Sequence, residues 1–315
     1  MSTAAKARIL LVIACFGWGV GFPLMKAVMA AQTQATGASG SWVTAQLQLL
    51  RYVCAGAVLA GMAWLATRRL PTRGEWTLGA ICGAAGAIGM QLQIDALNRA
   101  PASTVGFITQ FYVLVIPLVA AVRTRRAPGW LTIASVILAL AGVAVLSGMS
   151  PSDLRPGAGE MMVLAASAIF TVQIMALEEP RFAGCNGLHI TAAMFMVMAL
   201  LALPLVACTG PGLAGLPACL SVPGSAWPLA AIVLVGTCLP YAIMNRWQRE
   251  VSSTEAGIIY CSEALFAAAA SLVLPSLLAR MLGVPYVDET PTVTMAIGGG
   301  LVIAGAVLVQ LRRRS

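Results

Sequence analysis

Long apolar segments recur along the whole chain, and only short polar stretches separate them. Ten of these segments are close to the roughly 20 residues that a helix needs to cross a bilayer. They lie at 9–30, 42–66, 76–97, 101–122, 129–148, 158–179, 187–207, 226–247, 254–278 and 290–310. None shows the strict alternation of a membrane barrel strand. The pattern therefore predicts an all-α polytopic membrane protein with ten transmembrane helices.

Two pairs of similar segments, with one member of each pair in each half of the chain, indicate an internal repeat. The pairs are 98–104 with 248–254, and 138–146 with 301–309. Each half then holds five helices, and because five is odd the two halves must cross the bilayer in opposite directions. Inverted repeats are a common plan of secondary transporters, which bind substrate where the repeats meet. We expect residues 1–150 to form the first five-helix repeat and residues 151–315 the second.

Basic residues are unevenly divided between the two sides of the predicted bundle. Fourteen of the 19 Lys and Arg residues lie on the side that holds both chain ends, and three lie on the other side: Arg99, Arg155 and Arg280. Cytoplasmic loops carry an excess of Lys and Arg. The distribution therefore predicts a multi-pass protein of the bacterial inner membrane with both termini in the cytoplasm. Ten spans, an even number, agree with that orientation.

The composition supports the membrane class and excludes several others. Hydrophobic residues make up 59% of the chain and charged residues 10%, which leaves more apolar surface than a soluble protein buries. The net charge of +8 follows from the basic residues that flank the apolar segments, so no nucleic-acid partner is expected. The eight cysteines form no CxxC pair, His189 stands outside any HExxH motif, and no GxxxxGK occurs. We expect no metal site, no cofactor and no enzymatic activity.

The first apolar segment carries residues that a lipid-facing helix does not need. On a helix, Trp18, Phe22 and Lys26 share one face, because they are spaced by four residues. Gly17 and Gly21 form a GxxxG motif, which lets another helix approach closely. One interpretation is an ordinary first span with interfacial anchors. The other is a helix that lines a polar path through the bilayer.

Other polar and aromatic residues within the apolar segments are candidates for the same path. Lys26 and Arg51 fall in the outer half of the bilayer together with Asp95, and either cation suits a substrate carboxylate. The alternative is that the two cations snorkel to the membrane surface or pair with Asp95. Amide and aromatic side chains on other helix faces have packing as their alternative role. The predicted substrate-binding residues are Trp18, Phe22, Lys26, Arg51, Gln110, Phe111, Gln173 and Tyr260.

Glu263 is the one acidic residue predicted near the middle of a membrane-spanning helix. Removing a carboxylate from water favours its neutral acid form, so a change in hydration moves a proton on or off the group. We therefore identify Glu263 as the candidate proton-coupling residue. The alternative is a protonated Glu263 that is hydrogen-bonded within the bundle and has a structural role only.

Several of these residues resemble the signature of the EamA-type family in the drug/metabolite transporter superfamily. The similarity lies in Trp18-Gly19, Phe22-Pro23, Lys26, Leu50-Arg51-Tyr52, segments 102–104 and 117–118, Gly142-Val143, Gly305-Ala306, Tyr241 and Ser253-Thr254. It covers nearly the whole chain. The resemblance implies ten helices in two inverted repeats and secondary transport of small metabolites, often export. The segment 277–291 is longer than is usual for that family.

The expected function is secondary transport, as an exporter, of a small metabolite such as an amino acid or a related amphipathic compound. The expected partners are that small-molecule substrate and the lipid bilayer. Protons are a candidate coupling ion, and the working form is a monomer or a homodimer. The alternative at this point is a non-transporting membrane sensor or assembly subunit.

Overall fold

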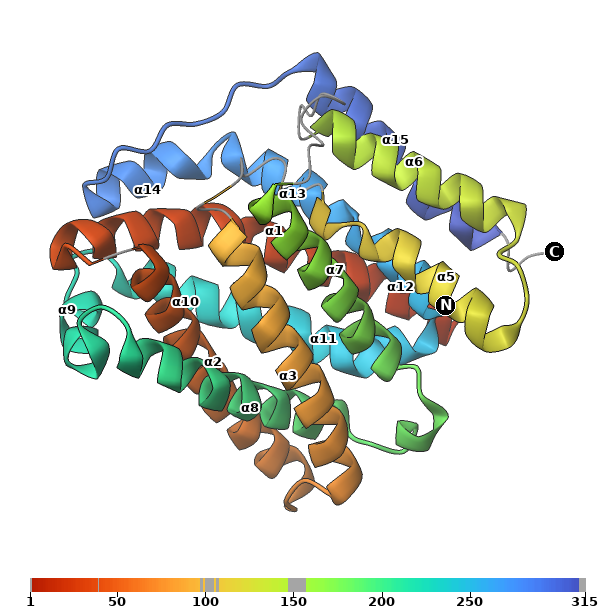
Figure 1. Cartoon of the computed structure of the whole chain (residues 1–315), viewed down its shortest axis with the longest axis horizontal. Helices are drawn as coiled ribbons and strands as arrows, with labels where there is room; N and C mark the ends of the chain where they lie inside the picture. Colours follow the sequence, from red (N-terminus) through yellow and green to blue (C-terminus); the bar gives the residue numbers. More distant parts are fainter. Residues whose placement is uncertain are drawn as a thin grey trace.

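The described residues of the protein, in a computed structural model, form helices and turns and contain no strand (Figure 1). The structure describes residues 2–38, 40–96, 99, 105, 108–146 and 157–311. The first half of the chain holds α1 (Thr3–Thr36), α2 (Gly40–Thr67), α3 (Arg73–Ala96), α5 (Tyr112–Thr124) and α6 (Trp130–Leu146). The second half holds α7 (Ala158–Ala176), η2 (Pro180–Phe182), α8 (Gly187–Cys208), η3 (Gly212–Gly215), α9 (Leu216–Leu220), α10 (Ala226–Val233), η4 (Leu234–Cys238), α11 (Leu239–Trp247), η5 (Gln248–Glu250), α12 (Ser253–Tyr260), α13 (Ser262–Ser271), α14 (Leu274–Leu282) and α15 (Val293–Leu311).

The helices confirm the all-α membrane class that the apolar pattern predicts. Six helical runs among the described residues are long and apolar enough to cross a bilayer: α1, α2, α3, α7, α8 and the run Ala226–Glu250. A seventh is the pair Ser253–Ser271 and Leu274–Leu282, which bends by 59° between its parts. Three shorter apolar helices lie at Tyr112–Thr124, Trp130–Val145 and Val293–Val309. The number of spans remains a prediction.

Two of the apolar segments are not the continuous helices that their length suggests. In segment 101–122 the chain turns at Gln110 and Phe111, and α5 begins only at Tyr112. In segment 254–278 the helix breaks first at Cys261, between α12 and α13, and again before α14. Pro275 explains the second break, because it lies in the first turn of α14 and has no backbone N–H to donate to the preceding turn.

α1 runs through the middle of the bundle and contacts α2 as well as helices from α9 to α14 (Figure 1). Its glycines make these contacts possible. A Cβ on Gly17 would lie 2.5 Å from the carbonyl oxygen of Val235, and one on Gly19 would lie 2.7 Å from the backbone nitrogen of Ala267. Gly21 faces the Cα of Gly236. The close approach expected from the GxxxG motif is therefore present, and the π-helical turn η4 is its partner.

α6 and α15 lie side by side along one edge of the molecule and contact each other through two glycines (Figure 1). A Cβ on Gly142 would lie 2.7 Å from the backbone nitrogen of Val302, and one on Gly305 would lie 3.0 Å from that of Ala139. The two contacts are reciprocal. Adding 163 to Ala139 and Gly142 gives Val302 and Gly305, the same shift that relates segments 138–146 and 301–309.

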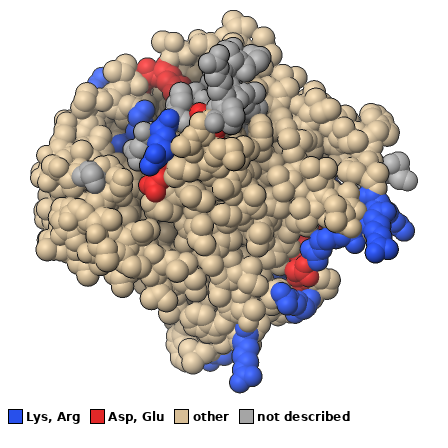
Figure 2. All heavy atoms as spheres, viewed as in Figure 1, with Lys and Arg blue, Asp and Glu red and all other residues tan. Residues whose placement is uncertain are grey.

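Charged side chains gather at opposite margins of an apolar surface. Figure 2 shows most lysines and arginines along the lower right of the molecule, and a smaller group of mixed sign at the upper left. The face between them is almost entirely uncharged in this view. Such a belt is what a bilayer requires, because charges inside hydrocarbon are costly unless they face the interior of the bundle.

The contact between α3 and α8 depends on small side chains, which gives a stability prediction. A Cβ on Gly79 would lie 2.5 Å from the Cβ of Ala193 and 2.9 Å from the carbonyl oxygen of Ile190. We expect Gly79→Ala to destabilise the protein by about 1–3 kcal/mol, the usual cost of overpacking. Thermal unfolding in detergent, followed by tryptophan fluorescence, measures the effect.

The matched control is Gly61→Ala on α2, where an added Cβ meets nothing within 4 Å. This variant should keep or slightly raise the melting temperature, because alanine is the better helix former. Equal melting temperatures for the two variants would contradict the close packing of α3 on α8.

Candidate functional site

A cavity of about 100 Å³ lies at the centre of the bundle, between helices of both halves of the chain. Its walls come from α1, α2, α3, α5, α7, α11, α12 and α13, together with Thr109 and the π-turn at Gly236. Six of the nine residues predicted as site residues from the sequence line it: Trp18, Phe22, Arg51, Gln173, Tyr260 and Glu263. The fold therefore brings together residues that are up to 245 positions apart in the sequence.

Trp18 stands at the centre of an aromatic cluster on the cavity wall. Its ring meets Tyr241 and Tyr260 edge to face, at centroid distances of 5.3 and 5.4 Å, and Tyr241 meets Phe195 at 5.3 Å. The indole Nε1 of Trp18 is buried and has no hydrogen-bond partner among the described residues. A buried donor without a partner costs roughly 1–3 kcal/mol. An acceptor inside the cavity would remove that cost.

Arg51 is a buried cation, with 3% of its surface exposed. Its Nε donates a hydrogen bond to Thr237 Oγ1 at 3.1 Å, and one terminal nitrogen lies 2.9 Å from the sulfur of Met25. No carboxylate forms an ion pair with it within the described ranges. A guanidinium has five N–H donors, so Arg51 retains donors for an anionic group in the cavity. A buried charge with no protein counter-ion is costly, and such residues commonly serve a ligand.

Glu263 lies in the first turn of α13 and lines the same cavity. Gly19 on α1 lets the backbone of α13 come this close, since a Cβ there would lie 2.9 Å from the carbonyl oxygen of Glu263. The described residues provide no hydrogen bond or ion pair to the Glu263 carboxyl. The structural alternative for Glu263, a hydrogen bond within the bundle, therefore has no partner in this part of the chain.

Lys26 is not part of the cavity wall. It is exposed, and its Nζ lies 5.1 Å from the centre of the Tyr286 ring in the segment after α14. Burial raises the pKa of Tyr286 to about 12, so the ring stays neutral beside the cation. The residues around Tyr286 pack on the far half of α1, where Leu24 and Val28 form a second apolar core with Leu278. The unusually long segment 277–291 thus lies beside Lys26, which stays exposed.

Asp95 does not pair with either cation, contrary to one alternative from the sequence. Its carboxylate accepts a hydrogen bond from Gln91 Nε2 at 3.0 Å. Gln91 in turn accepts one from Gln48 on α2, and Tyr52 donates to Gln48. A polar chain therefore links α3 to α2 beside Arg51.

Gln110 and Phe111 also lie outside the cavity lining. Gln110 is buried and accepts a hydrogen bond from the Tyr112 hydroxyl at 2.6 Å, while Phe111 packs against the main apolar core. Thr109 and Tyr112 line the cavity instead. The turn at 110–111 interrupts the regular helix. Side chains before and after it therefore do not share the face that a continuous 3.6-residue period predicts.

Several lining residues were not identified from the sequence. Met90 and Gln93 come from α3, and Gln93 Nε2 donates a hydrogen bond to Thr109 Oγ1 at 2.9 Å. Tyr241 and Met244 come from α11. Two signals for this group stand in the sequence: Gln93, an amide within an apolar helix and on the same face as Met90, and Tyr241, which is among the residues that carry the family resemblance.

The cavity combines a cation, an unpartnered indole N–H, a carboxyl group, and apolar walls of aromatic and methionine side chains. This arrangement suits a small molecule that carries both a carboxylate and an amino group. Within the described residues no cluster of His, Cys, Asp and Glu is placed to hold a metal ion.

Comparisons with known proteins bear on this site. Residues 5–148 match the model of the EamA-like transporter family. Over 310 residues the chain is 26% identical to the probable terminal-alkyne amino-acid exporter of Streptantibioticus cattleyicolor, covering 98% of this chain and 94% of that relative. A protein of known crystal structure shares the fold, with a TM-score of 0.66, 20% identity, and coverage of 95% of this chain and 97% of the other.

Proposed function

Because residues 5–148 match the model of the EamA-like transporter family, we propose that the chain exports a small amino acid or a related zwitterionic compound. The family match and the exporter relative confirm the resemblance recognised in the sequence, and they confirm that the chain is a transporter rather than an enzyme. They favour transport over the alternative of a sensor or an assembly subunit. The observation that carries the substrate class is the joint presence of Arg51, Trp18 and Glu263 around one cavity.

The proposed binding mode assigns each end of the zwitterion to a different part of the wall. The substrate carboxylate accepts hydrogen bonds from Arg51 and from the Trp18 indole, which have donors to spare. The ammonium group faces Glu263 and the aromatic rings of Trp18 and Tyr260, which attract cations. The apolar side chain of the substrate lies against Met90.

The central cavity is small for a substrate-binding site. Its volume of about 100 Å³ is below the roughly 300–1,000 Å³ of ordinary ligand pockets. We propose that the walls separate to admit substrate from one side of the membrane and release it on the other, which is the general scheme of alternating access.

We further propose ten spans in two inverted repeats, 1–150 and 151–315. Six long helical runs, one bent pair and three shorter apolar helices support that number. The reciprocal glycine contacts of α6 and α15 support a pseudo-two-fold relation between the halves. The break at Gln110–Phe111 also lies 150 residues before the break at Tyr260–Cys261, the same shift that relates segments 98–104 and 248–254.

The topology prediction follows from the distribution of basic residues. With both termini in the cytoplasm of the inner membrane, a thiol introduced by Thr72→Cys should react with an impermeant reagent from the cytoplasmic side only. A thiol introduced by Leu213→Cys, between α8 and α9, should react from the outside only. Mass spectrometry of the labelled peptides distinguishes these sites from the native cysteines. The reverse pattern at either position would reject the orientation.

The substrate prediction concerns both charged ends of the ligand. In inside-out vesicles, labelled amino-acid uptake should be inhibited by free amino acids and at least tenfold less by their methyl esters or N-acetyl derivatives. Arg51→Gln should raise KM by roughly 10- to 100-fold, since a hydrogen bond to a charged group contributes about 1.5–3 kcal/mol. It should also abolish the preference for the acid over the ester.

The exposed cation Arg280 gives the matched control, because Arg280→Gln should leave KM and the ester preference unchanged. If no amino acid is transported, or if Arg51→Gln discriminates acid from ester as the parent does, the proposed substrate class is wrong.

The coupling prediction concerns Glu263, for which we propose proton uptake during the transport cycle. Glu263→Gln imitates the permanently protonated acid with nearly the same shape. The variant should still exchange substrate between equal pools at saturating concentration, but it should lose accumulation driven by a pH gradient. Glu289→Gln, in the exposed segment before α15, should keep both activities. Undiminished pH-driven accumulation by Glu263→Gln would exclude the proton role.

A further inference from the structure

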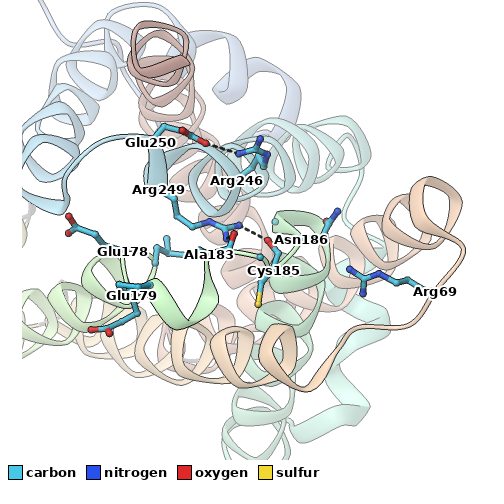
Figure 3. A pocket seen from close by; sticks show the side chains of 13 residues that line it. Arg69, Glu178, Glu179, Ala183, Cys185, Asn186, Arg246, Arg249 and Glu250 are labelled. Atoms are coloured by element: carbon cyan, nitrogen blue, oxygen red, sulfur yellow. Dashed lines mark hydrogen bonds and ion pairs between the residues drawn. The ribbon is translucent and has the colours of Figure 1, made fainter. Parts of the chain in front are cut away.

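A second and larger cavity, of about 560 Å³, lies at the end of the bundle where α1 begins. Lys6 stands 4.8 Å above the ring of Trp247, and Arg8 pairs with Glu255, so η5 and the start of α12 adjoin the start of α1. Figure 3 shows this cavity between η5 and the segment that joins α7 to α8. None of the residues predicted as site residues lines it.

One side chain, Gln248, stands between this end cavity and the central cavity. It is buried, with 2% of its surface exposed. Its Nε2 donates a hydrogen bond to the carbonyl oxygen of Ile174 at 2.6 Å, and its Oε1 accepts one from the Tyr260 hydroxyl at 2.7 Å. Ile174 and Tyr260 both line the central cavity.

The residues just beyond this barrier line the end cavity. Leu177 lines the end cavity and follows Ile174 by three residues. At 1.5 Å of rise per helical residue, this separation is about 4.5 Å along the helix axis. Arg249, the neighbour of Gln248, also lines the end cavity. The two cavities are therefore separated by about one helical turn, and the hydrogen bonds of Gln248 cross that separation.

Arg249 fixes the wall around the barrier. Its guanidinium donates to the carbonyl oxygens of Phe182 and Cys185 at 3.0 Å and to that of Asn245 at 3.1 Å. These bonds tie the segment after α7 to the end of α11. The wall can stay in place while Gln248 alone releases its two partners.

We propose that the end cavity is the vestibule through which substrate reaches the central cavity, and that Gln248 is the gate between them. The vestibule is lined by three arginines and three glutamates: Arg69, Arg246, Arg249, Glu178, Glu179 and Glu250. Opposite charges in equal number give no net attraction for a simple anion or cation. Several of them already pair within the protein: Arg69 with Glu75, Glu179 with Arg123, and Arg246 with Glu250. A zwitterion, which carries charges of both signs, can exchange partners with such pairs without a change in net charge.

The choice of ligand class rests on the proposed export of zwitterions, but the gate can be tested without any substrate. The reporter is a thiol introduced by Met244→Cys, at a buried position on the wall of the central cavity. Inside-out vesicles are treated with a membrane-impermeant thiol reagent, and mass spectrometry measures modification at position 244. Native cysteines do not interfere, because each peptide is read separately.

Gln248→Ala should raise the modification rate at position 244 by roughly tenfold, because two buried hydrogen bonds that favour the closed gate are lost. Gln46→Ala is the matched control. Gln46 is similarly buried and also makes two hydrogen bonds, both donated, to Gln32 Oε1 and to the carbonyl oxygen of Val43, but it lies in α2 and lines neither cavity. It should leave the rate unchanged.

Gln248→Met keeps the length of the side chain without its amide, so it replaces Gln248→Ala if the smaller residue prevents insertion. An unchanged rate in both Gln248 variants would overturn the gate, as would an equal rise in Gln46→Ala. Failure to transport amino acids would reject the substrate class and leave these rates unaffected, so the two proposals fail separately.

Discussion

The close approach of α1 to its neighbours is the constraint on which the rest of the structure depends. Gly17 and Gly21 admit the π-turn η4 and the start of α11, while Gly19 admits α13. A Cβ on Gly17 or Gly19 would come within 3 Å of these backbones, so a larger residue at either position would force them apart, whereas a Cβ on Gly21 would lie 3.7 Å from the Cα of Gly236. The consequence is a central helix that brings Trp18 between Tyr241 and Tyr260, and that places the Glu263 backbone beside its own. The cavity can form because α1 carries glycines rather than larger side chains at this level.

A second constraint acts on the polar groups inside the bilayer, where no water satisfies them. Most of them are used in the protein itself: Gln93 bonds to Thr109, Gln91 to Asp95, and Gln248 to Ile174 and Tyr260. The Trp18 indole has no partner in the described part of the chain, and Arg51 has no counter-ion there. These two groups meet in one cavity, whereas the other buried polar atoms without a partner among the described residues lie outside its lining: Trp42 Nε1, Ser167 Oγ and Asn245 Oδ1. The feature that favours a binding site is therefore the pairing of Trp18 with Arg51 around one cavity.

The sequence predicts the helices well. It also predicts which residues share a face on a long, regular helix, but it does not predict where a helix breaks. Trp18 and Phe22 lie on an unbroken helix, so their spacing places them on one wall. Gln110 and Phe111 lie on a turn, where a regular 3.6-residue period does not fix the face, and neither lines the central cavity. Lys26 continues the face of Trp18, but it is exposed and lies beside Tyr286, in a segment distant in the sequence. The contacts of Gln248 also depend on three separate elements, so no local pattern indicates them.

The reciprocal glycine contacts of α6 and α15 mean that a substitution in one half of the chain affects the packing of the other half. A larger residue at Gly142 would move the axes of both helices apart and would loosen the contact at Gly305 as well. Substitutions in one half are therefore selected against by the shape of the other half, although 163 positions separate the two glycines. If the halves arose by duplication, they have not been free to diverge at this seam, and it should preserve the ancestral sequence longest.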